Sequence, residues 1–407
     1  MATLPILQES PPPGSKQAAV TAMRIAIIIE HVNRQGGQER VAAELVERLG
    51  AGHEVHLFCF SARGIDESRV RVHRLRCPFR SGTAQSLWIL AASALACDPR
   101  RFDVVLSQGG NALRQDAVLV HTCHALRTRL VREVQWRYSP PNALGALVHN
   151  LRGRAFTYLE GRAVKRCRGR VLTVSQMLKD YVVAQHGLRP DEIRVAENGV
   201  DHSVFHPGLR DQYRKAVRDE LWLTDDDFVA LFVGGRWFDK GVPFAIEALG
   251  MMRARSARLM VVGHGDMSFF LRMNQRNNVP ERVIFVPPTP DTHRYYGAAD
   301  CFVFPSEAEG FPLVIGEATA SGLPLVATPV GGTERLIIDG ESGFFVKHDA
   351  REIAECLDFL AEHPDVCRQM GARAHEASLA LSWDRQAAEI EAALQARPDL
   401  QVGGACA

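Results

Sequence analysis

The sequence lacks an apolar run long enough to cross a membrane, a C-x-x-C pair and any excess of one charge. We therefore expect neither a signal peptide nor a transmembrane helix. A formal net charge of +1 gives no global attraction to nucleic acid, so any basic surface must be local. Nine scattered cysteines favour reduced thiols in a cytoplasmic protein over a disulfide framework or a zinc site.

The length of 407 residues, with 46% hydrophobic and 23% charged residues, predicts a globular protein with two cores. We expect a disordered leader over residues 1–22 and a first domain over 23–207. A second domain would follow over 208–380. A C-terminal helix over 381–397 would then cross back to the first domain, before a tail over 398–407.

Short buried-strand patterns alternate with helical patterns in both halves of the chain. Residues 24–30 form the first strand pattern, and residues 228–233 restart the alternation. This order predicts an α/β fold with two Rossmann-like, doubly wound parallel sheets. The loop at Gly36 and Gly37 lacks the G-x-G-x-x-G fingerprint. It is either a tight turn or a place where backbone amides approach a phosphate.

Two glutamates lie beside a predicted anion site in the second half. Residues 312–320 are expected to form a short helix between two buried strands, with Pro312 near its first position. Glu309 lies in the preceding loop and Glu317 in the helix. The start of a helix at the carboxyl end of a parallel strand binds anions. Two carboxylates there indicate a ligand with hydroxyl groups as well as phosphates, such as a nucleotide sugar.

Cations follow another strand of the same predicted sheet. Arg236 and Lys240 come after the strand at 228–233, and Gly263 to Asp266 follow the next one. Because these loops meet at one edge of the sheet, the cations can neutralise a diphosphate and the charge that develops on it as a leaving group. Each residue taken alone is an ordinary surface or loop residue, and the hypothesis depends on their combination.

Three further motifs have simpler interpretations. Asn198-Gly199 suits a turn with positive φ. The run of acidic residues at 225–227 precedes a strand and is better interpreted as a polar turn than as a metal motif. His121 and His124 form an H-x-x-H, which alone is not enough to indicate a metal site.

The segment from 127 to 170 is the most basic part of the chain. Between residues 152 and 170 it carries seven cations, namely Arg152, Arg154, Arg162, Lys165, Arg166, Arg168 and Arg170. The segment is either a solvated helix face or a patch that faces anionic phospholipid or a phosphorylated acceptor.

Taken together, the motifs of the second half resemble those of retaining glycosyltransferases of family 4. The resemblance implies GT-B architecture, in which two Rossmann-like domains face each other across a cleft. The matching motifs are Arg236-x3-Lys240-Gly241, Gly263-x-Gly265, Ala299-Asp300-x3-Phe304-Pro305-Ser306, and Glu309-Gly310-Phe311 with Glu317. The resemblance extends from Arg24 to about Ala393 and is densest between Val233 and Val346. The chain departs from the family in the closer Arg–Lys spacing and in Pro312, where glycine is common.

The resemblance implies a role for each matching residue. The catalytic residues would be Glu309, His121, Arg236 and Lys240, where either His121 or His124 could be the active-site histidine. The donor would also be bound by Gly37, His124, Gly263, Gly265, Gly310, Phe311, Leu313, Val314 and Glu317. In this set Arg236 and Lys240 would bind the diphosphate, Glu317 the ribose and Glu309 the transferred sugar.

The resemblance also implies an activity. A hexose would pass from a nucleoside-diphosphate sugar, such as UDP-glucose or GDP-mannose, to an acceptor hydroxyl with retention and without a metal or cofactor. The first domain would bind the acceptor, a glycan or glycolipid such as a lipopolysaccharide core or an exopolysaccharide precursor, and the second would bind the donor. The protein would be cytoplasmic, with peripheral contact to an anionic membrane through residues 152–170. Two alternatives are a nucleotide-sugar epimerase and a degenerate sugar-nucleotide binding module.

Overall fold

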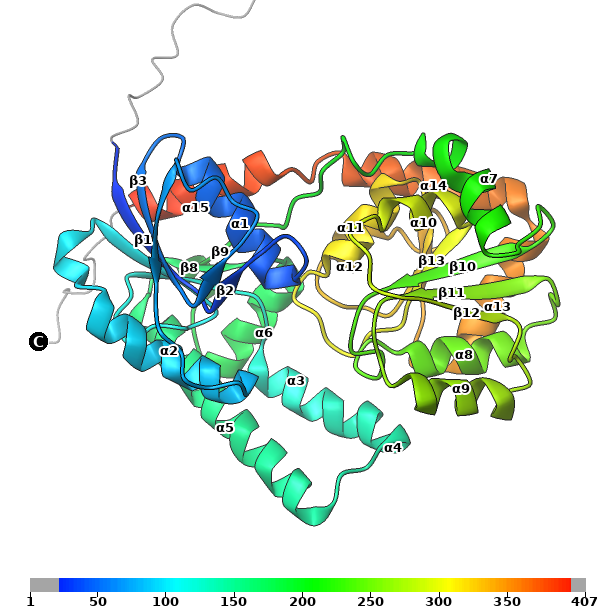
Figure 1. Ribbon diagram of the computed structural model, residues 1–407, viewed down its shortest axis with the longest axis horizontal. Coiled ribbons are helices and arrows are strands. Elements are labelled where there is room, and N and C mark those ends of the chain that lie inside the picture. Colours follow the sequence, from blue (N-terminus) through cyan, green and yellow to red (C-terminus); the bar gives the residue numbers. More distant parts are fainter. Residues whose placement is uncertain (1–21, 397–407) are drawn as a thin grey trace, which may run out of the picture.

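The computed structural model describes residues 22–396, which form two α/β halves side by side (Figure 1). The first half is drawn in blue to green and the second in green to orange. The leader expected over 1–22 and the tail expected over 398–407 lie outside the described residues, apart from residue 22.

The first half is built on a parallel sheet with the strand order β5-β3-β1-β6-β7-β8-β9. Its strands are β1 (Arg24–Ile28), β3 (Glu54–Cys59), β5 (Val70–Arg74), β6 (Val104–Gln108), β7 (Ala117–Val120), β8 (Val171–Thr173) and β9 (Ile193–Val195). Two short strands, β2 (His31–Val32) and β4 (Ser61–Ala62), pair separately. The helices are α1 (Gly37–Leu49), α2 (Gly82–Ala96), α3 (His124–Leu130), α4 (Trp136–Tyr138), α5 (Ala143–Arg166) and α6 (Gln176–His186).

The second half repeats this plan with the order β12-β11-β10-β13-β14-β15. Its strands are β10 (Phe228–Val233), β11 (Ala257–Val262), β12 (Val283–Val286), β13 (Cys301–Phe304), β14 (Leu325–Ala327) and β15 (Gly343–Phe345). The helices are α7 (Leu209–Glu220), α8 (Val242–Met251), α9 (Met267–Arg276), α10 (His293–Ala298), α11 (Leu313–Ala320), α12 (Thr333–Leu336), α13 (Ala350–Glu362) and α14 (Pro364–Ser378). The predicted α/β class with two doubly wound parallel sheets is therefore confirmed.

Local geometry differs from the sequence expectation at two places. Pro312 is the residue before α11 and not its first residue, since its ψ of 124° is extended. The positive φ expected at Asn198-Gly199 is wrong, because neither residue is among those with positive φ. Gly199 is needed for another reason: a Cβ there would lie 2.2 Å from the backbone nitrogen of Trp383.

The last helix, α15 (Trp383–Gln395), packs on α1 of the first half, as the red ribbon in Figure 1 shows. Arg48 of α1 donates from Nε to Asp384 at 2.6 Å, and Gln386 donates to the Asn198 side chain at 2.8 Å. The chain thus begins and ends its described part in the same half. The domain limits at residues 207, 380 and 397 stay predictions.

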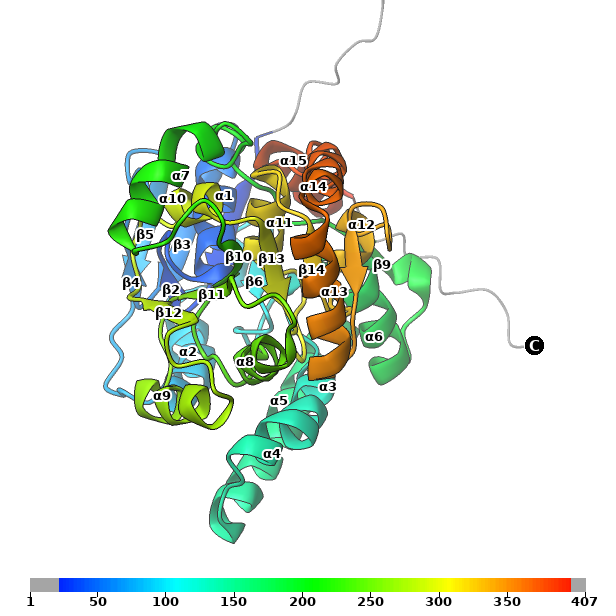
Figure 2. The same cartoon turned by 90° about the vertical axis from the view of Figure 1, so that its right-hand side faces the viewer.

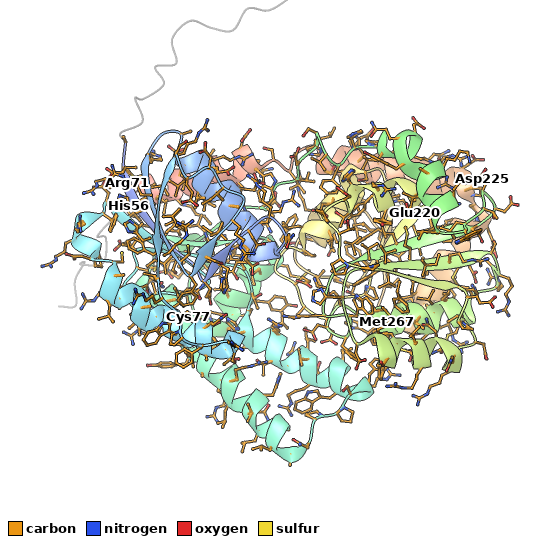
Figure 3. All side chains as sticks on the ribbon, viewed as in Figure 1. His56, Arg71, Cys77, Glu220, Asp225 and Met267 are labelled. Atoms are coloured by element: carbon orange, nitrogen blue, oxygen red, sulfur yellow. The ribbon has the colours of Figure 1, made fainter. Side chains whose placement is uncertain are left out.

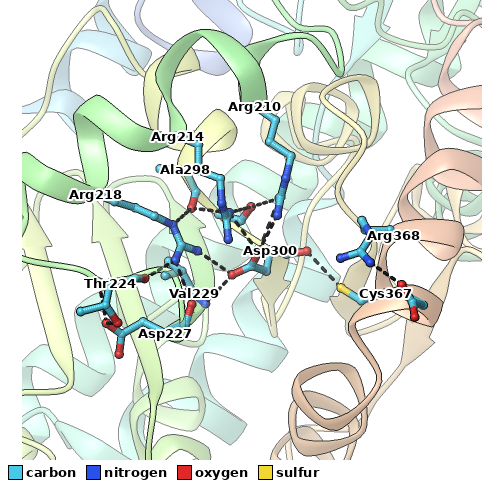
Figure 4. Close-up of polar contacts among 12 residues, drawn as sticks. Arg210, Arg214, Arg218, Thr224, Asp227, Val229, Ala298, Asp300, Cys367 and Arg368 are labelled. Carbon is cyan, nitrogen blue, oxygen red and sulfur yellow. Dashed lines mark hydrogen bonds and ion pairs between the residues drawn. The ribbon is translucent and has the colours of Figure 1, made fainter.

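A buried ion pair fixes α7 and α10 to the second sheet (Figure 4). The Arg218 guanidinium, with 2% of its side chain exposed, donates to Asp300 at 2.8 Å and to the Ala298 carbonyl at 3.0 Å. Asp300 also accepts from the backbone N–H of Val229 at 2.9 Å, at the start of β10. Arg214 lies 3.0 Å from the same carboxylate. Asp300 belongs to one of the matching motifs, and its contacts show that it holds elements of the second half together.

All eight cysteines within residues 22–396 are free thiols, as the sequence predicts. Cys77 is partly exposed on the first half, near α2 in Figure 3. The acidic run at 225–227 is a turn, in which Asp227 accepts from the Thr224 N–H at 2.8 Å. The polar-turn interpretation of that run is confirmed.

Substitution Asp300→Ala should destabilise the protein by about 3 kcal/mol, because it leaves the Arg218 guanidinium buried without its counter-charge. Chemical unfolding measures this change. Asp226→Ala, at an exposed position of the neighbouring turn, is the control and should change the free energy of unfolding by less than about 0.5 kcal/mol. Equal effects of the two substitutions would contradict the role given to Asp300.

Candidate active site

The loop between β13 and α11 is held from both sides by backbone and side-chain contacts. Glu309 accepts at its carbonyl from the Gly331 N–H at 3.1 Å. Phe311 accepts at its carbonyl from the Asn198 side chain at 3.0 Å. Ser175, the cap of α6, donates to the Gly310 carbonyl at 2.6 Å. These contacts hold the loop in place at the carboxyl end of β13. Leu313 and Val314 are the first two residues of α11, so their backbone N–H groups have no partner within the helix.

Two of the sequence-predicted site residues form a direct ion pair. Lys240 Nζ lies 2.7 Å from Glu309 Oε1, and about a fifth of each side chain is exposed. Lys240 also lies over the Phe304 ring, 5.2 Å from its centroid. Glu309 and Lys240 are thus brought together between the ends of β10 and β13.

Arg236 lies in the same loop as Lys240 but is more exposed, and it donates to Asp239 three residues further on. Its φ of +53° is in the left-handed region, which costs a non-glycine residue energy. The Arg236 side chain is thus paired with a carboxylate of its own loop. Asp239 was not among the residues selected from the sequence.

Gly263 and Gly265 are explained by packing around β10. A Cβ at Gly263 would lie 2.1 Å from the Gly234 carbonyl, and one at Gly265 would lie 2.3 Å from the Trp237 ring. Gly263 also has a φ of +137°. These glycines let the loops after β10 and β11 touch, and whether they also contact a ligand stays a prediction.

The two halves meet where the loop before α11 touches the end of β7. A Cβ at Gly310 would lie 2.0 Å from the His121 carbonyl oxygen. Gly310, a predicted site residue, is therefore in contact with one of the two candidate histidines. A larger residue here would push the two halves apart.

The two candidate histidines lie in different environments. His121 is partly exposed beside this contact, and its Nε2 lies 2.6 Å from Gln108 Oε1. Burial lowers the pKa of His121 to about 4. His124 begins α3, and its ring stacks on Phe156 of α5 at 5.2 Å. Of the two, His121 is the one at the boundary between the halves.

The first half reaches the predicted ribose-binding glutamate through α1. Arg40 Nη1 donates to Glu317 Oε1 at 2.7 Å, and the Tyr296 hydroxyl donates to Oε2 at 2.9 Å. Space is open around Gly37 at the start of α1, since a Cβ there would have no atom within 4 Å. Sequence reasoning missed Arg40 and Tyr296, although Arg40 follows Gly37 by three positions and so shares its helix face.

A second arginine of the first half also reaches the loop that carries Arg236 and Lys240. Arg127 of α3 lies 3.6 Å from Asp239, the carboxylate that Arg236 binds. The pKa of Arg127 is lowered by burial and by the charge of Arg236. Asp239 thus lies between two guanidinium groups from opposite halves.

A cavity of about 400 Å³ lies beside Glu309, between α3, α6 and the loops after β14 and β15. Its apolar lining includes Leu126, Met177, Tyr181 and Phe345. Glu309 therefore lies between the loop that carries Arg236 and Lys240 on one side and this cavity on the other. Within residues 22–396, no group of three His, Cys, Asp or Glu side chains is placed to hold a metal ion.

Comparison with known families divides the chain as the two sheets do. The family described as "Glycosyltransferase Family 4" matches residues 35–204, and the one described as "Glycosyl transferases group 1" matches residues 227–363. The chain belongs to the family 4 glycosyltransferases. The predicted family and GT-B architecture are therefore confirmed.

The relatives of this chain include the D-inositol 3-phosphate glycosyltransferase of Nocardia farcinica. The two are 34% identical over 50% of this chain and 47% of that protein. The match thus spans about half the length of the curated relatives.

Among solved structures, WaaG, a glycosyltransferase involved in lipopolysaccharide biosynthesis, superposes with a TM-score of 0.75 at 17% identity, covering 91% of this chain and 99% of WaaG. HepE of Anabaena, in complex with UDP-glucose, gives a TM-score of 0.67 at 18% identity, covering 90% and 98%. At these identities the likeness concerns the fold.

The His121 ring should stay neutral from pH 8 to pH 5, because burial lowers its pKa to about 4. NMR titration of the histidine ring protons, assigned with a His121→Gln variant, measures this value. Since the unfolded chain binds the proton near pH 6.5 and the folded chain only near pH 4, the free energy of unfolding should fall as the pH decreases between these values. A midpoint near 6.5 for His121 would contradict the lowered pKa.

Proposed function

We propose that this protein transfers a hexose from a nucleoside-diphosphate sugar to an acceptor hydroxyl. The observation that carries the proposal is the Lys240–Glu309 ion pair at 2.7 Å, set between the strand ends and the start of α11. A cation, a carboxylate and free helix amides gathered in one place match the diphosphate and the hydroxyl groups of such a donor. HepE, whose structure contains UDP-glucose, has the same fold.

In this proposal the cations act on the leaving diphosphate. Arg236 and Lys240, together with the amides of Leu313 and Val314, would stabilise the charge that develops as the sugar–phosphate bond breaks. Diphosphate binding would release Glu309 from Lys240, so that its carboxylate accepts a sugar hydroxyl. Gly37, Gly263 and Gly265 would let the backbone approach the donor closely.

We further propose that the reaction retains the anomeric configuration and needs no metal, with cations of the chain neutralising the diphosphate. His121 would lie at the reaction centre and act as a neutral hydrogen-bonding group, consistent with its lowered pKa. His124 would support it from the start of α3. The contact between Gly310 and His121 would keep water out of the closed site.

The acceptor would enter from the side of the cavity beside Glu309. Its apolar wall, with Leu126, Tyr181 and Phe345, suits a lipid-linked or other amphipathic glycan. WaaG acts in lipopolysaccharide biosynthesis, whereas the curated relatives are named for inositol 3-phosphate. We favour a glycan or glycolipid acceptor, as in a lipopolysaccharide core or exopolysaccharide precursor, because the outward face of α5 suits a membrane surface.

The outward face of α5 combines apolar and basic side chains. Leu144, Leu147 and Leu151 follow one another along the helix and are 68%, 54% and 56% exposed. The exposed cations Arg152 and Arg154 flank this row. The only acidic residue of α5, Glu160, is buried. Figure 2 shows the helices α3, α4 and α5 projecting from the body of the molecule.

We propose that this face of α5 contacts the anionic surface of a bilayer on the cytoplasmic side, where a lipid-linked acceptor would be held. Apolar side chains flanked by cations, without an exposed acid, are the chemistry that binds such a surface. The contact begins earlier in the chain than the basic segment 152–170 suggests, because the apolar row lies at 144–151. No helix among the described residues is long and apolar enough to cross a membrane.

The epimerase alternative receives no support from the relatives, whose names describe glycosyltransferases. A degenerate binding module would bind the donor and neither transfer nor hydrolyse it. The intact Lys240–Glu309 pair favours the enzyme.

Replacing Lys240 should abolish most transfer. A thermal-shift screen across UDP-, GDP- and ADP-sugars first identifies the donor, since a ligand that binds the folded state raises its stability. With that donor, Lys240→Ala should lower kcat by about 100-fold or more, because one charge that stabilises the leaving group is lost. Lys215→Ala is the matched control, since Lys215 pairs with Asp219 at 2.7 Å on the exposed side of α7. Normal turnover in Lys240→Ala would refute the proposed site.

Removing the cations of α5 should weaken binding to anionic vesicles. In co-sedimentation with phosphatidylglycerol–phosphatidylcholine vesicles at low salt, Arg152→Gln with Arg154→Gln should lose about 2 kcal/mol, roughly 1 kcal/mol for each cation. The triple change Leu144→Ser, Leu147→Ser and Leu151→Ser should also weaken it. Leu95→Ser, at an exposed leucine of α2, should have no effect. If the wild-type protein did not sediment with these vesicles, this membrane contact would be rejected.

A further inference from the structure

Glu317 is a buried carboxylate held by donors from both halves of the molecule. Only 8% of its side chain is exposed. Arg40 of α1 donates to Oε1 at 2.7 Å, and the hydroxyl of Tyr296 in α10 donates to Oε2 at 2.9 Å. Each oxygen of a carboxylate can accept two hydrogen bonds, so one acceptor position remains on each oxygen.

Glu307, in the loop before α11, shows what happens to a buried carboxyl without such donors. It is 5% exposed, and neither of its oxygens has a hydrogen-bond partner. Burial and the nearby charge of Asp239 raise the pKa of Glu307 to about 9. A neutral carboxyl is a poorer acceptor for two hydroxyl groups than a carboxylate. Glu317 has the partners that Glu307 lacks.

Both partners of Glu317 are fixed by their surroundings. The Arg40 guanidinium lies 5.9 Å from the ring centroid of Trp383, the first residue of α15. The Tyr296 ring is fully buried and packs against Phe205 at 5.5 Å and Phe302 at 5.9 Å. The carboxylate plane of Glu317 is therefore set before any ligand arrives.

We propose that Arg40 and Tyr296 are positioning residues that hold Glu317 for the two hydroxyl groups of a ribose. The proposal rests on the proposed function, because it takes a nucleoside diphosphate as the ligand. Since Arg40 comes from the first half and Glu317 from the second, the ribose site is complete only when the two halves are in contact. Donor affinity is thereby linked to closure of the cleft.

If Arg40 positions Glu317 for the ribose, replacing Arg40 should lower the affinity for a ligand with ribose hydroxyl groups and not the affinity for a ligand without them. Isothermal titration calorimetry with UDP, GDP or ADP, whichever gives the largest thermal shift, and with its 2′,3′-dideoxy counterpart measures this difference. Arg40→Gln should reduce the ratio of the two affinities by about tenfold, the usual effect of losing one charged hydrogen-bond partner. Arg40→Lys should restore part of it, because the charge is retained.

Two further variants distinguish positioning of Glu317 from the alternative that Arg40 only holds the two halves together. Tyr296→Phe removes only a hydroxyl from the core and should also lower the preference for the ribose form. Arg48→Gln is the matched control, since Arg48 lies on the same helix and pairs with Glu44 and Asp384 at 2.6 Å without touching Glu317.

The outcomes are distinguishable. If Arg40→Gln weakened both ligands equally, Arg40 would only join the halves and the proposal would be wrong. An unchanged preference for the ribose form in Arg40→Gln and Tyr296→Phe would refute it as well. If the wild-type protein bound none of the three nucleoside diphosphates, the proposed function itself would fail.

Discussion

The contact between Gly310 and the His121 carbonyl is the constraint on which the cleft depends. Because no Cβ is present at Gly310, the loop before α11 can touch the end of β7. The same loop is packed from behind, where a Cβ at Gly331 would lie 1.9 Å from the Gly310 carbonyl. The backbone here is fixed between two surfaces, and this places Glu309 and the start of α11 at the boundary of the two halves. A site formed by residues of both halves needs a contact, such as this one, that fixes the distance between the halves.

Three acids of this boundary are paired with cations, and the pairs cross between elements. Lys240 binds Glu309 within the second half, while Arg127 and Arg40 of the first half reach Asp239 and Glu317. Charges in a partly buried cleft attract one another strongly unless water or a ligand intervenes. A diphosphate would compete with Glu309 and Asp239 for Lys240, Arg127 and Arg236, whereas the hydroxyl groups of a sugar nucleotide would need the acids. The same residues therefore stabilise the empty cleft and match the proposed donor.

The sequence predicts the fold well, and it brings out the loops that we propose to bind the donor, because both depend on local patterns. Buried strands of four to six residues, such as β10 and β13, are contiguous apolar runs, and Lys240 and Glu309 follow them directly. Arg40, Tyr296 and Arg127 could not be found in this way. They lie 277, 21 and 112 residues from their acidic partners, and nothing in their own neighbourhood reveals the pairing. The role of Gly199 was not predicted for the same reason, because the residue that leaves no room for a side chain there is Trp383, far along the chain.

This difference explains why the donor class is easier to infer than the acceptor. The loops proposed to bind the donor combine a contiguous motif with strand ends, so a short stretch of sequence carries most of the proposed chemistry. The cavity beside Glu309 is instead lined by α3, α6 and loops of the second half, and its lining residues from the two helices, such as Leu126 and Tyr181, belong to no motif. Its shape depends on how α3 and α5 cross, where a Cβ at Gly153 would lie 2.5 Å from the Thr128 side chain. Because α5 packs on α3, which lines the cavity, and also carries the exposed apolar and basic face, it links the proposed membrane contact to the proposed acceptor space. In this proposal, a change in α5 would alter where the acceptor is held and leave the loops proposed for the donor intact.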